Sequence, residues 1–185
     1  ETLTISPHGN GTHTECVGHI SKEVNTINQS LKTFFFLAEV VSVDVTDIDN
    51  GDQIITISTL QAAVKSSTEA LVIRTIPNLP TKKNFMYSGD NPPYLEADAA
   101  TWLREHGVIH LLIDLPSVDR EEDEGKLEAH HNFWNYPTAP RTDATITELI
   151  YVPDEVPDGL YVLNLQICSL ETDATPSKPV LYSLH

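Results

Sequence analysis

Five of the eight histidines fall in two short stretches, residues 8–19 and residues 130–131. The first stretch, residues 8–19, contains His8, His13, Glu15 and His19. His13 and Glu15 are two residues apart, so in extended backbone their side chains point to the same side. One imidazole nitrogen and one carboxylate at this spacing can bind a single divalent cation. His19 follows four residues after Glu15 and could complete the ligand set or act as a base beside it.

Two glycines of the same stretch, Gly11 and Gly18, would let the backbone turn tightly around such a site. The alternative interpretation is a glycine-rich surface loop that happens to contain polar residues. His8 is the weaker candidate, because a histidine near the start of a chain is usually solvated.

The second stretch places His130 and His131 side by side just after a charged loop. Adjacent residues of a strand point to opposite faces, so at most one of the two is expected to face a shared site. Glu148 stands in an otherwise apolar segment, where a buried carboxylate would need a cation or hydrogen bonds to stay charged. An outward-facing strand residue is the alternative. Asp114 is predicted to end a parallel strand, where α/β proteins place ligands.

Apolar periodicity and β-branched runs predict the elements that must position these residues. Strands are expected at residues 34–45, 70–76, 108–112, 146–152, 160–170 and 180–184, and helices at 58–66 and 94–106. Residues 24–32 fit either a short helix or a loop. A strand, a helix and a strand in that order imply a right-handed crossover and at least one parallel pair. The expected fold class is α/β, with more strand than helix.

Length and charge narrow the possible functions. A chain of 185 residues is about one domain, so residues 1–185 are expected to form a single domain. Its 11 Lys and Arg against 27 Asp and Glu give a net charge of −16, which disfavours nucleic acid as a partner. The apolar stretches are far shorter than the roughly 20 residues that span a bilayer, so no membrane span is expected. Two cysteines without a CxxC pair favour a reducing compartment, and we expect a cytoplasmic protein.

Four segments resemble the cyclase family of metal-dependent hydrolases, which includes bacterial kynurenine formamidases and isatin hydrolases. Residues 10–19 (NGTHTECVGH) are similar to the family signature HxGTHxDxPxH. Residues 95–119 (LEADAATWLREHGVIHLLIDLPSVD) resemble its helix and the following strand, which ends in a D-[TL]-x-S-x-D run. Residues 129–130 and 146–149 resemble its later metal-binding His and Glu. The four segments follow in the family's order and touch most of the chain.

The resemblance implies a mixed, barrel-like β-sheet with flanking helices, and one or two divalent metals per chain, zinc or manganese. His13 would bind the first metal, and Glu15 would stand in for the family's bridging Asp. His130 would bind the second metal, and Glu148 would contact both. His19 matches the last histidine of the motif, which acts as proton donor and acceptor in the family.

Three features depart from the family pattern. Gly9 occupies the position of the family's first metal-binding histidine, and His8, one residue earlier, is the candidate to replace it. Glu15 replaces Asp, which moves the carboxylate outward by roughly 1.5 Å. Only 12 residues precede His13, so the family's leading segment is expected to be missing or short here.

The expected function is therefore a metal-dependent hydrolase of a small amide or cyclic amide, in which metal-activated water attacks a carbonyl. A lactone or ester hydrolase using the same site is one alternative. A non-catalytic descendant that binds a small ligand beside a degenerate metal site is another. The resemblance also implies a homodimer or larger homo-oligomer.

Overall fold

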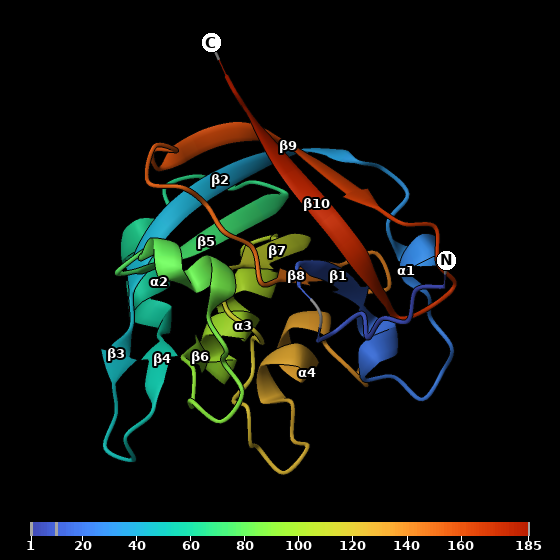
Figure 1. Cartoon of the computed structure of the whole chain (residues 1–185), viewed down its shortest axis with the longest axis horizontal. Coiled ribbons are helices and arrows are strands. Elements are labelled where there is room, and N and C mark those ends of the chain that lie inside the picture. Colours follow the sequence, from blue (N-terminus) through green and yellow to red (C-terminus); the bar gives the residue numbers. More distant parts are fainter. Residues whose placement is uncertain (1, 10, 185) are drawn as a thin grey trace.

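Seven strands of the described chain close into a barrel, and helices cover one side of it (Figure 1). The structure is a computed structural model that describes residues 2–9 and 11–184, so Asn10 of the motif lies outside the described residues. The strands are His13–Cys16 (β1), Phe35–Asp44 (β2), Thr46–Asp47 (β3), Gln53–Ile55 (β4), Ala70–Ile76 (β5), Tyr94–Leu95 (β6), His110–Ile113 (β7), Thr145–Glu148 (β8), Gly159–Ile167 (β9) and Ala174–Ser183 (β10). The α-helices are Ile27–Ser30 (α1), Ile57–Ala63 (α2), Ala97–Glu105 (α3) and Glu128–Trp134 (α4), and 3₁₀ helices span Val17–His19 and Pro80–Asn84.

The order around the barrel is β1-β10-β9-β2-β5-β7-β8, and β3, β4 and β6 form a separate small sheet. β2, β5, β7 and β8 are parallel to one another, whereas β1, β9 and β10 join antiparallel neighbours. The parallel pairing of β5 with β7 confirms the parallel pair predicted from the strand, helix, strand order. The α/β, strand-rich, barrel-like fold class is confirmed as well.

Two apolar cores lie on opposite faces of the barrel wall. Alternation along β5 sends Ala70 and Val72 into the barrel interior, and Leu71 and Ile73 toward the helices. Because both faces of this strand are covered, its apolar run is continuous rather than alternating with polar residues. Cys16 of β1 packs in the barrel interior, so His13 and Glu15 lie on the face that the helices cover.

The helix predicted at residues 94–106 begins later than expected, at Ala97. Tyr94 and Leu95 form β6 instead, which pairs in parallel with β4. The cause is remote hydrogen bonding, because Leu95 donates its backbone N–H to Val118 and Glu96 donates its own to Ile55. The predicted end of the helix is confirmed, since Gly107 follows it with a φ of +88°.

Three further elements differ from the prediction. His130 and His131 lie on a helix, α4, rather than on a strand. β8 ends at Glu148, because Leu149 takes a φ of +53° and leaves the ladder. The last strand is ten residues long rather than five, because its first part pairs with β1 and its remainder with β9.

Residues 24–32 contain the short helix α1. Among the described residues, no helix has the length and the apolar character needed to cross a lipid bilayer. That residues 1–185 form one domain stays a prediction.

Candidate metal centre

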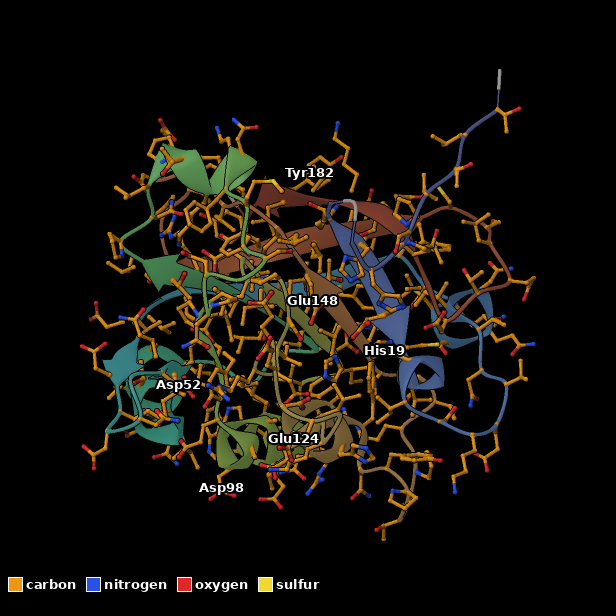
Figure 2. The ribbon with its side chains drawn as sticks, turned by 60° about the horizontal axis from the view of Figure 1, so that its bottom comes forward. His19, Asp52, Asp98, Glu124, Glu148 and Tyr182 are labelled. Carbon is orange, nitrogen blue, oxygen red and sulfur yellow. The ribbon has the colours of Figure 1, made fainter. Side chains whose placement is uncertain are left out.

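The structure brings the six predicted site residues together on the helix-covered face of β1. His13 and Glu15 come from β1, Glu148 from the neighbouring β8 and His130 from α4. Figure 2 places Glu148 in the interior and His19 on the 3₁₀ helix that follows β1. His13 and Glu148 are direct partners across the β1–β8 ladder, which fixes their spacing. The side chains of β1, β8 and α4 in this group are almost completely buried.

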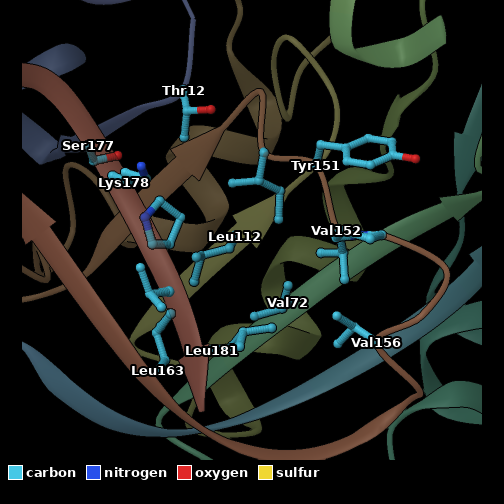
Figure 3. A pocket seen from close by; sticks show the side chains of 14 residues that line it. Thr12, Val72, Leu112, Tyr151, Val152, Val156, Leu163, Ser177, Lys178 and Leu181 are labelled. Carbon is cyan, nitrogen blue, oxygen red and sulfur yellow. The ribbon is translucent and has the colours of Figure 1, made fainter. Parts of the chain in front are cut away.

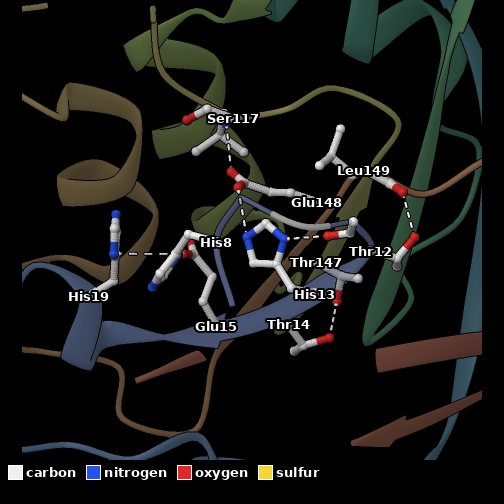
Figure 4. A network of polar contacts seen from close by, with 12 residues as sticks. His8, Thr12, His13, Thr14, Glu15, His19, Ser117, Thr147, Glu148 and Leu149 are labelled. Carbon is white, nitrogen blue, oxygen red and sulfur yellow. Dashed lines mark hydrogen bonds and ion pairs between the residues drawn. The ribbon is translucent and has the colours of Figure 1, made fainter. Parts of the chain in front are cut away.

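Glu15 is at the centre of the group, and each of its carboxylate oxygens faces a histidine. Oε1 lies 2.9 Å from Nε2 of His130, and Oε2 lies 3.0 Å from Nδ1 of His8. Figure 4 shows Glu15 with His8 and His19 beside it. Burial alone would raise the pKa of Glu15, but His130, His8 and His19 hold it well below its usual range. A carboxylate in this position can bridge two cations, because each oxygen has its own nitrogen neighbour.

His13 is held in one tautomer by its own strand. Nδ1 lies 2.9 Å from the backbone carbonyl of Gly11, so it carries a proton, and in the neutral ring Nε2 keeps its lone pair. Nε2 faces Glu148 at 3.3 Å without a hydrogen bond. Gly11, whose φ is +134°, provides the predicted tight turn that brings this carbonyl back onto the ring.

His130 is anchored by Asp119. The Asp119 carboxylate accepts a hydrogen bond from Nδ1 of His130 and further hydrogen bonds from the backbone N–H groups of Ala129 and His130. The first turn of α4 and the histidine ring are therefore fixed by one side chain. Nε2 of His130 then points at Glu15, as described above. Although burial lowers it, the pKa of His130 is raised well above its usual value by Glu15 and Asp119.

His8 reaches the same centre from the chain preceding β1. Its Nε2 lies 2.9 Å from Oδ2 of Asp173, while Nδ1 faces Glu15. Although partial burial lowers it, the pKa of His8 is raised to about 9 by the two carboxylates. The side chain is 31% exposed, so His8 remains partly solvated although both of its ring nitrogens face carboxylates.

His19 is close to the group but not tied to it. Nδ1 lies 3.8 Å from Oε2 of Glu15 and 3.6 Å from Oδ2 of Asp173, beyond hydrogen-bond length. Its ring packs against His8, with centroids 4.3 Å apart. Gly18 makes this position possible by close approach rather than by a tight turn, because a Cβ there would lie 2.1 Å from the carbonyl oxygen of Asn25.

The donor set fits a divalent cation. Among the described residues, three groups each offer three ligand atoms within 4.8 Å of one another: His8, His13 and Glu15; Glu15, His19 and His130; His8, His19 and Asp173. Within the described chain, Nε2 of His13 and Oε2 of Glu15 are buried polar atoms that make no hydrogen bond, although each lies within ion-pair distance of a charged neighbour, Glu148 at 3.3 Å and His8 at 3.0 Å. Buried polar atoms without a partner are costly, and a cation bound between them would satisfy both.

Glu148 completes the inner wall of the centre. Its Oε1 accepts the backbone N–H of Val118 at 2.8 Å and lies 3.8 Å from Nε2 of His130. Burial and the neighbouring Glu15 carboxylate raise the pKa of Glu148. Two carboxylates this close repel each other unless positive charge lies between them.

Other predicted candidates lie elsewhere. His131 turns away from the centre, and its Nδ1 contacts the backbone carbonyl of Tyr136. Asp114 is buried beside Lys82 and Thr75, where it accepts hydrogen bonds from both. The structure thus places one histidine of the adjacent pair in the site, as expected, although on a helix.

Sequence reasoning missed Asp173, and it did not assign Asp119 its role behind His130. Asp119 belongs to the D-x-S-x-D run, so the resemblance carried a signal for it. Asp173 stands just before β10 in a segment without a motif, and the pairing of Ala174 with Glu15 brings it to the site. Such a long-range pairing leaves no local trace in the sequence.

A cavity of about 810 Å³ opens beside His8. Its aromatic lining comes from Phe85, Tyr87 and Tyr151 rather than from Phe133 and Trp134 of α4. Phe133 and Trp134 are instead completely buried in the core.

A second cavity of about 440 Å³ lies inside the barrel among apolar side chains such as Val72, Leu112 and Leu163 (Figure 3). None of the candidate ligands lines this cavity, whereas His8 lines the larger one, so a substrate could approach the centre from the cavity beside His8.

A protein-family model named Cyclase, with the description "Putative cyclase", matches residues 1–120, well over half of the chain. The chain belongs to this cyclase family. The predicted membership of the family is thereby confirmed, and the matched range contains two of the four segments, residues 10–19 and 95–119.

Known relatives extend the similarity over nearly the whole chain. Kynurenine formamidase from Bacillus cereus is 29% identical over 180 residues, which are 97% of this chain and 78% of the relative. A solved structure described as a potential metal-dependent hydrolase with cyclase activity superposes with a TM-score of 0.69 at 17% identity, over 96% of this chain and 80% of that one. Isatin hydrolase A from Labrenzia aggregata, bound to benzyl benzoate, has a TM-score of 0.67 at 14% identity, over 97% of this chain and 74% of that one. Both solved structures therefore share the fold of this chain.

Proposed function

We propose that this cyclase-family protein is a metal-dependent hydrolase of small amides or cyclic amides. The observation that carries this is the buried Glu15 carboxylate, which faces the ring nitrogens of His8 and His130, while His13 presents an unpaired nitrogen beside it. The opposite nitrogen of each of these histidines is tied to an acceptor, which is the arrangement that metal-binding histidines use. The relatives named kynurenine formamidase and isatin hydrolase support hydrolysis.

One or two divalent ions, zinc or manganese, would be held here. His8, His13 and Glu15 form one candidate ligand set, and His130 and Glu148 would bind a second ion that shares Glu15. Nitrogen and oxygen ligands of this kind suit both metals. A bound divalent ion would lower the pKa of its water toward about 7, and the ion would also polarise a carbonyl oxygen.

His19 is the residue placed to move the proton. It lies beside Glu15 without a hydrogen bond to it, and its side chain is 26% exposed, so its ring nitrogens are free to reach water and substrate. In the proposed reaction His19 takes a proton from the attacking water and delivers it to the leaving nitrogen as the C–N bond breaks. The products are a carboxylic acid and an amine.

The cavity beside His8 supports a small aromatic substrate. Phe85 and Tyr87 pack edge to face with centroids 4.9 Å apart, and Tyr151 lies under the ammonium of Lys83. Flat aromatic amides such as formyl anilides, and cyclic lactams, match such a lining. A lactone or ester is the competing substrate, because metal-assisted attack on a carbonyl does not require a nitrogen leaving group. The non-catalytic alternative assumes a degenerate metal site. His8 counts against it, because it takes the place of the motif histidine and lies in one ligand group with His13 and Glu15.

Elemental analysis of protein purified without chelator tests the metal, with His13→Ala as the disrupted site and His106→Ala as a matched control. His106 stacks on Trp102, away from the centre. We expect one or two zinc or manganese ions per chain in the wild type and the control, and none or fewer in His13→Ala. Equal metal content in all three proteins would contradict the ligand assignment.

Hydrolysis of formyl anilides, lactams and lactones by the same proteins tests the reaction. His19→Ala is expected to fold and bind metal but to lose hydrolysis, by about 100-fold or more, as for loss of a general acid–base group. Full activity in this variant would remove His19 from the mechanism. Lactone turnover without amide turnover would favour the competing substrate class.

A further inference from the structure

We infer, on the basis of the proposed function, that Asp173 is a positioning residue that makes His8 the metal ligand which replaces the histidine missing at Gly9. Asp173 would not contact the metal itself. Its carboxylate would hold the His8 ring so that Nδ1 turns its lone pair toward the metal position beside Glu15.

The contacts of His8 carry this assignment. The two ring nitrogens face two different carboxylates, Nε2 toward Asp173 at 2.9 Å and Nδ1 toward Glu15 at 3.0 Å. When Nε2 donates its proton to Asp173, Nδ1 is the nitrogen left to bind a cation. Nδ1 then lies in one ligand group with His13 and Glu15, whose ligand atoms are within 4.8 Å of one another.

The opposite side of the centre shows the same arrangement. There Asp119 holds Nδ1 of His130, and Nε2 of that ring faces the other oxygen of Glu15. Glu15 is therefore flanked by two histidines, each with its own carboxylate behind it. A carboxylate behind a metal-binding histidine fixes the tautomer and the ring orientation, and raises the basicity of the ligand.

Asp173 is held in place by the backbone and is not a chance surface contact. Its carbonyl accepts the backbone N–H of Cys16 at 3.0 Å, and the next residue, Ala174, pairs with Glu15. Its Cβ is close to Gly18, since a Cβ on that glycine would approach it to 3.2 Å. The carboxylate thus starts from a fixed position beside β1.

The contact with Asp173 matters because His8 is separated from His13 by one residue more than in the family motif. A longer connection leaves the ligand with more conformations, and ordering them on metal binding costs entropy. A carboxylate that orients the ring before the metal arrives reduces that cost.

The zinc affinity of the purified protein, measured by competition with a chromogenic chelator, tests the assignment without any use of activity. Asp173→Ala is expected to weaken zinc binding by about 10- to 100-fold, the usual cost of removing a carboxylate behind a ligand histidine. Asp173→Asn is expected to recover most of the affinity, because the amide oxygen can still accept the Nε2 proton. Asp49→Ala is the matched control, since Asp49 is exposed and distant in sequence from the site, and it should bind zinc like the wild type.

Double variants separate positioning of His8 from a general effect on charge or folding. In a His8→Ala background, Asp173→Ala should cause no further loss of zinc affinity. In a His19→Ala background, Asp173→Ala should weaken zinc binding by the same factor as it does in the wild type. Circular dichroism checks the fold of each variant, and Asp173→Ser replaces Asp173→Ala if that variant does not fold.

Zinc affinity unchanged by Asp173→Ala, or lowered equally with and without His8, would overturn the role of Asp173. Wild-type protein that binds no zinc would overturn the proposed function together with this role. Zinc binding that depends on Asp173 through His8, in a protein without hydrolytic activity, would refute the proposed reaction alone and uphold the positioning role.

Discussion

Replacement of His110 by glutamine is expected to remove a large part of the acid sensitivity of this fold. His110 begins β7 and is 4% exposed, with Nδ1 2.9 Å from the hydroxyl oxygen of Thr145. Its ring packs on Phe36, with centroids 4.0 Å apart. Burial lowers the pKa of His110 from 6.5 to about 4, because the protonated ring would lose its hydration.

The direction and size of the effect follow from this shift. Below pH 6.5 the unfolded chain takes up a proton at this histidine, whereas the folded chain does so only near pH 4. The free energy of unfolding is therefore highest, as far as this residue is concerned, above pH 6.5, and it falls as the pH drops toward 4. Each unit of pKa is about 1.4 kcal/mol, so the whole shift corresponds to about 3 kcal/mol. At about pH 5 the folded state should already have lost about 2 kcal/mol through this residue alone.

Urea unfolding at about pH 7.5 and pH 5, with chelator present, measures the loss. The quantity to compare is the change in unfolding free energy between the two pH values, in the wild type and in His110→Gln. Other groups titrate alike in both proteins, so the difference between the two changes isolates His110. His106→Gln, at a half-buried position stacked on Trp102, is the control and should behave like the wild type. An equal pH dependence in His110→Gln and the wild type would refute the reasoning.

Three further changes test other parts of the structure. Gly18→Ala should reduce hydrolysis by about 10-fold or more, because its Cβ would collide with the carbonyl of Asn25 and displace His19; unchanged turnover would contradict this. Glu15→Gln should abolish metal binding in elemental analysis, since it removes the central charge between His8 and His130; full metal content would contradict this. Sedimentation should give twice the mass of one chain or more, and a monomer at all concentrations would contradict the expected homo-oligomer.

The barrel could be predicted where local pattern and tertiary environment agree. The limits of β5 match the prediction, and its first four residues form the continuous apolar run expected of a strand that is covered on both faces. The start of α3 could not be predicted, because Tyr94 and Leu95 stay extended only through partners on β4 and at Val118. The first part of β10 was missed for a similar reason, since a segment that contains Pro176 looks like a loop until β1 pairs with it.

The residues of the candidate site also differ in how far they could be predicted from the sequence. His13 and Glu15 could be found from spacing alone, because neighbours on one face of a strand stay neighbours in the fold. His130 and Glu148 needed the family resemblance, since only the folded barrel brings α4 and β8 to β1. Asp173 had no motif, and its position depends on a single ladder between strands far apart in the sequence.

The two departures from the family motif make sense together rather than separately. Shifting the first histidine to His8 moves its origin one residue away from the centre, and Glu in place of Asp lengthens the carboxylate by roughly 1.5 Å. In the structure the longer carboxylate reaches Nδ1 of His8 on one side and Nε2 of His130 on the other. A shorter carboxylate at position 15 would leave one of these two contacts unmade. The longer loop and the longer acid therefore form one adjusted arrangement, and a chain with only one of these two changes should bind metal more weakly than this one.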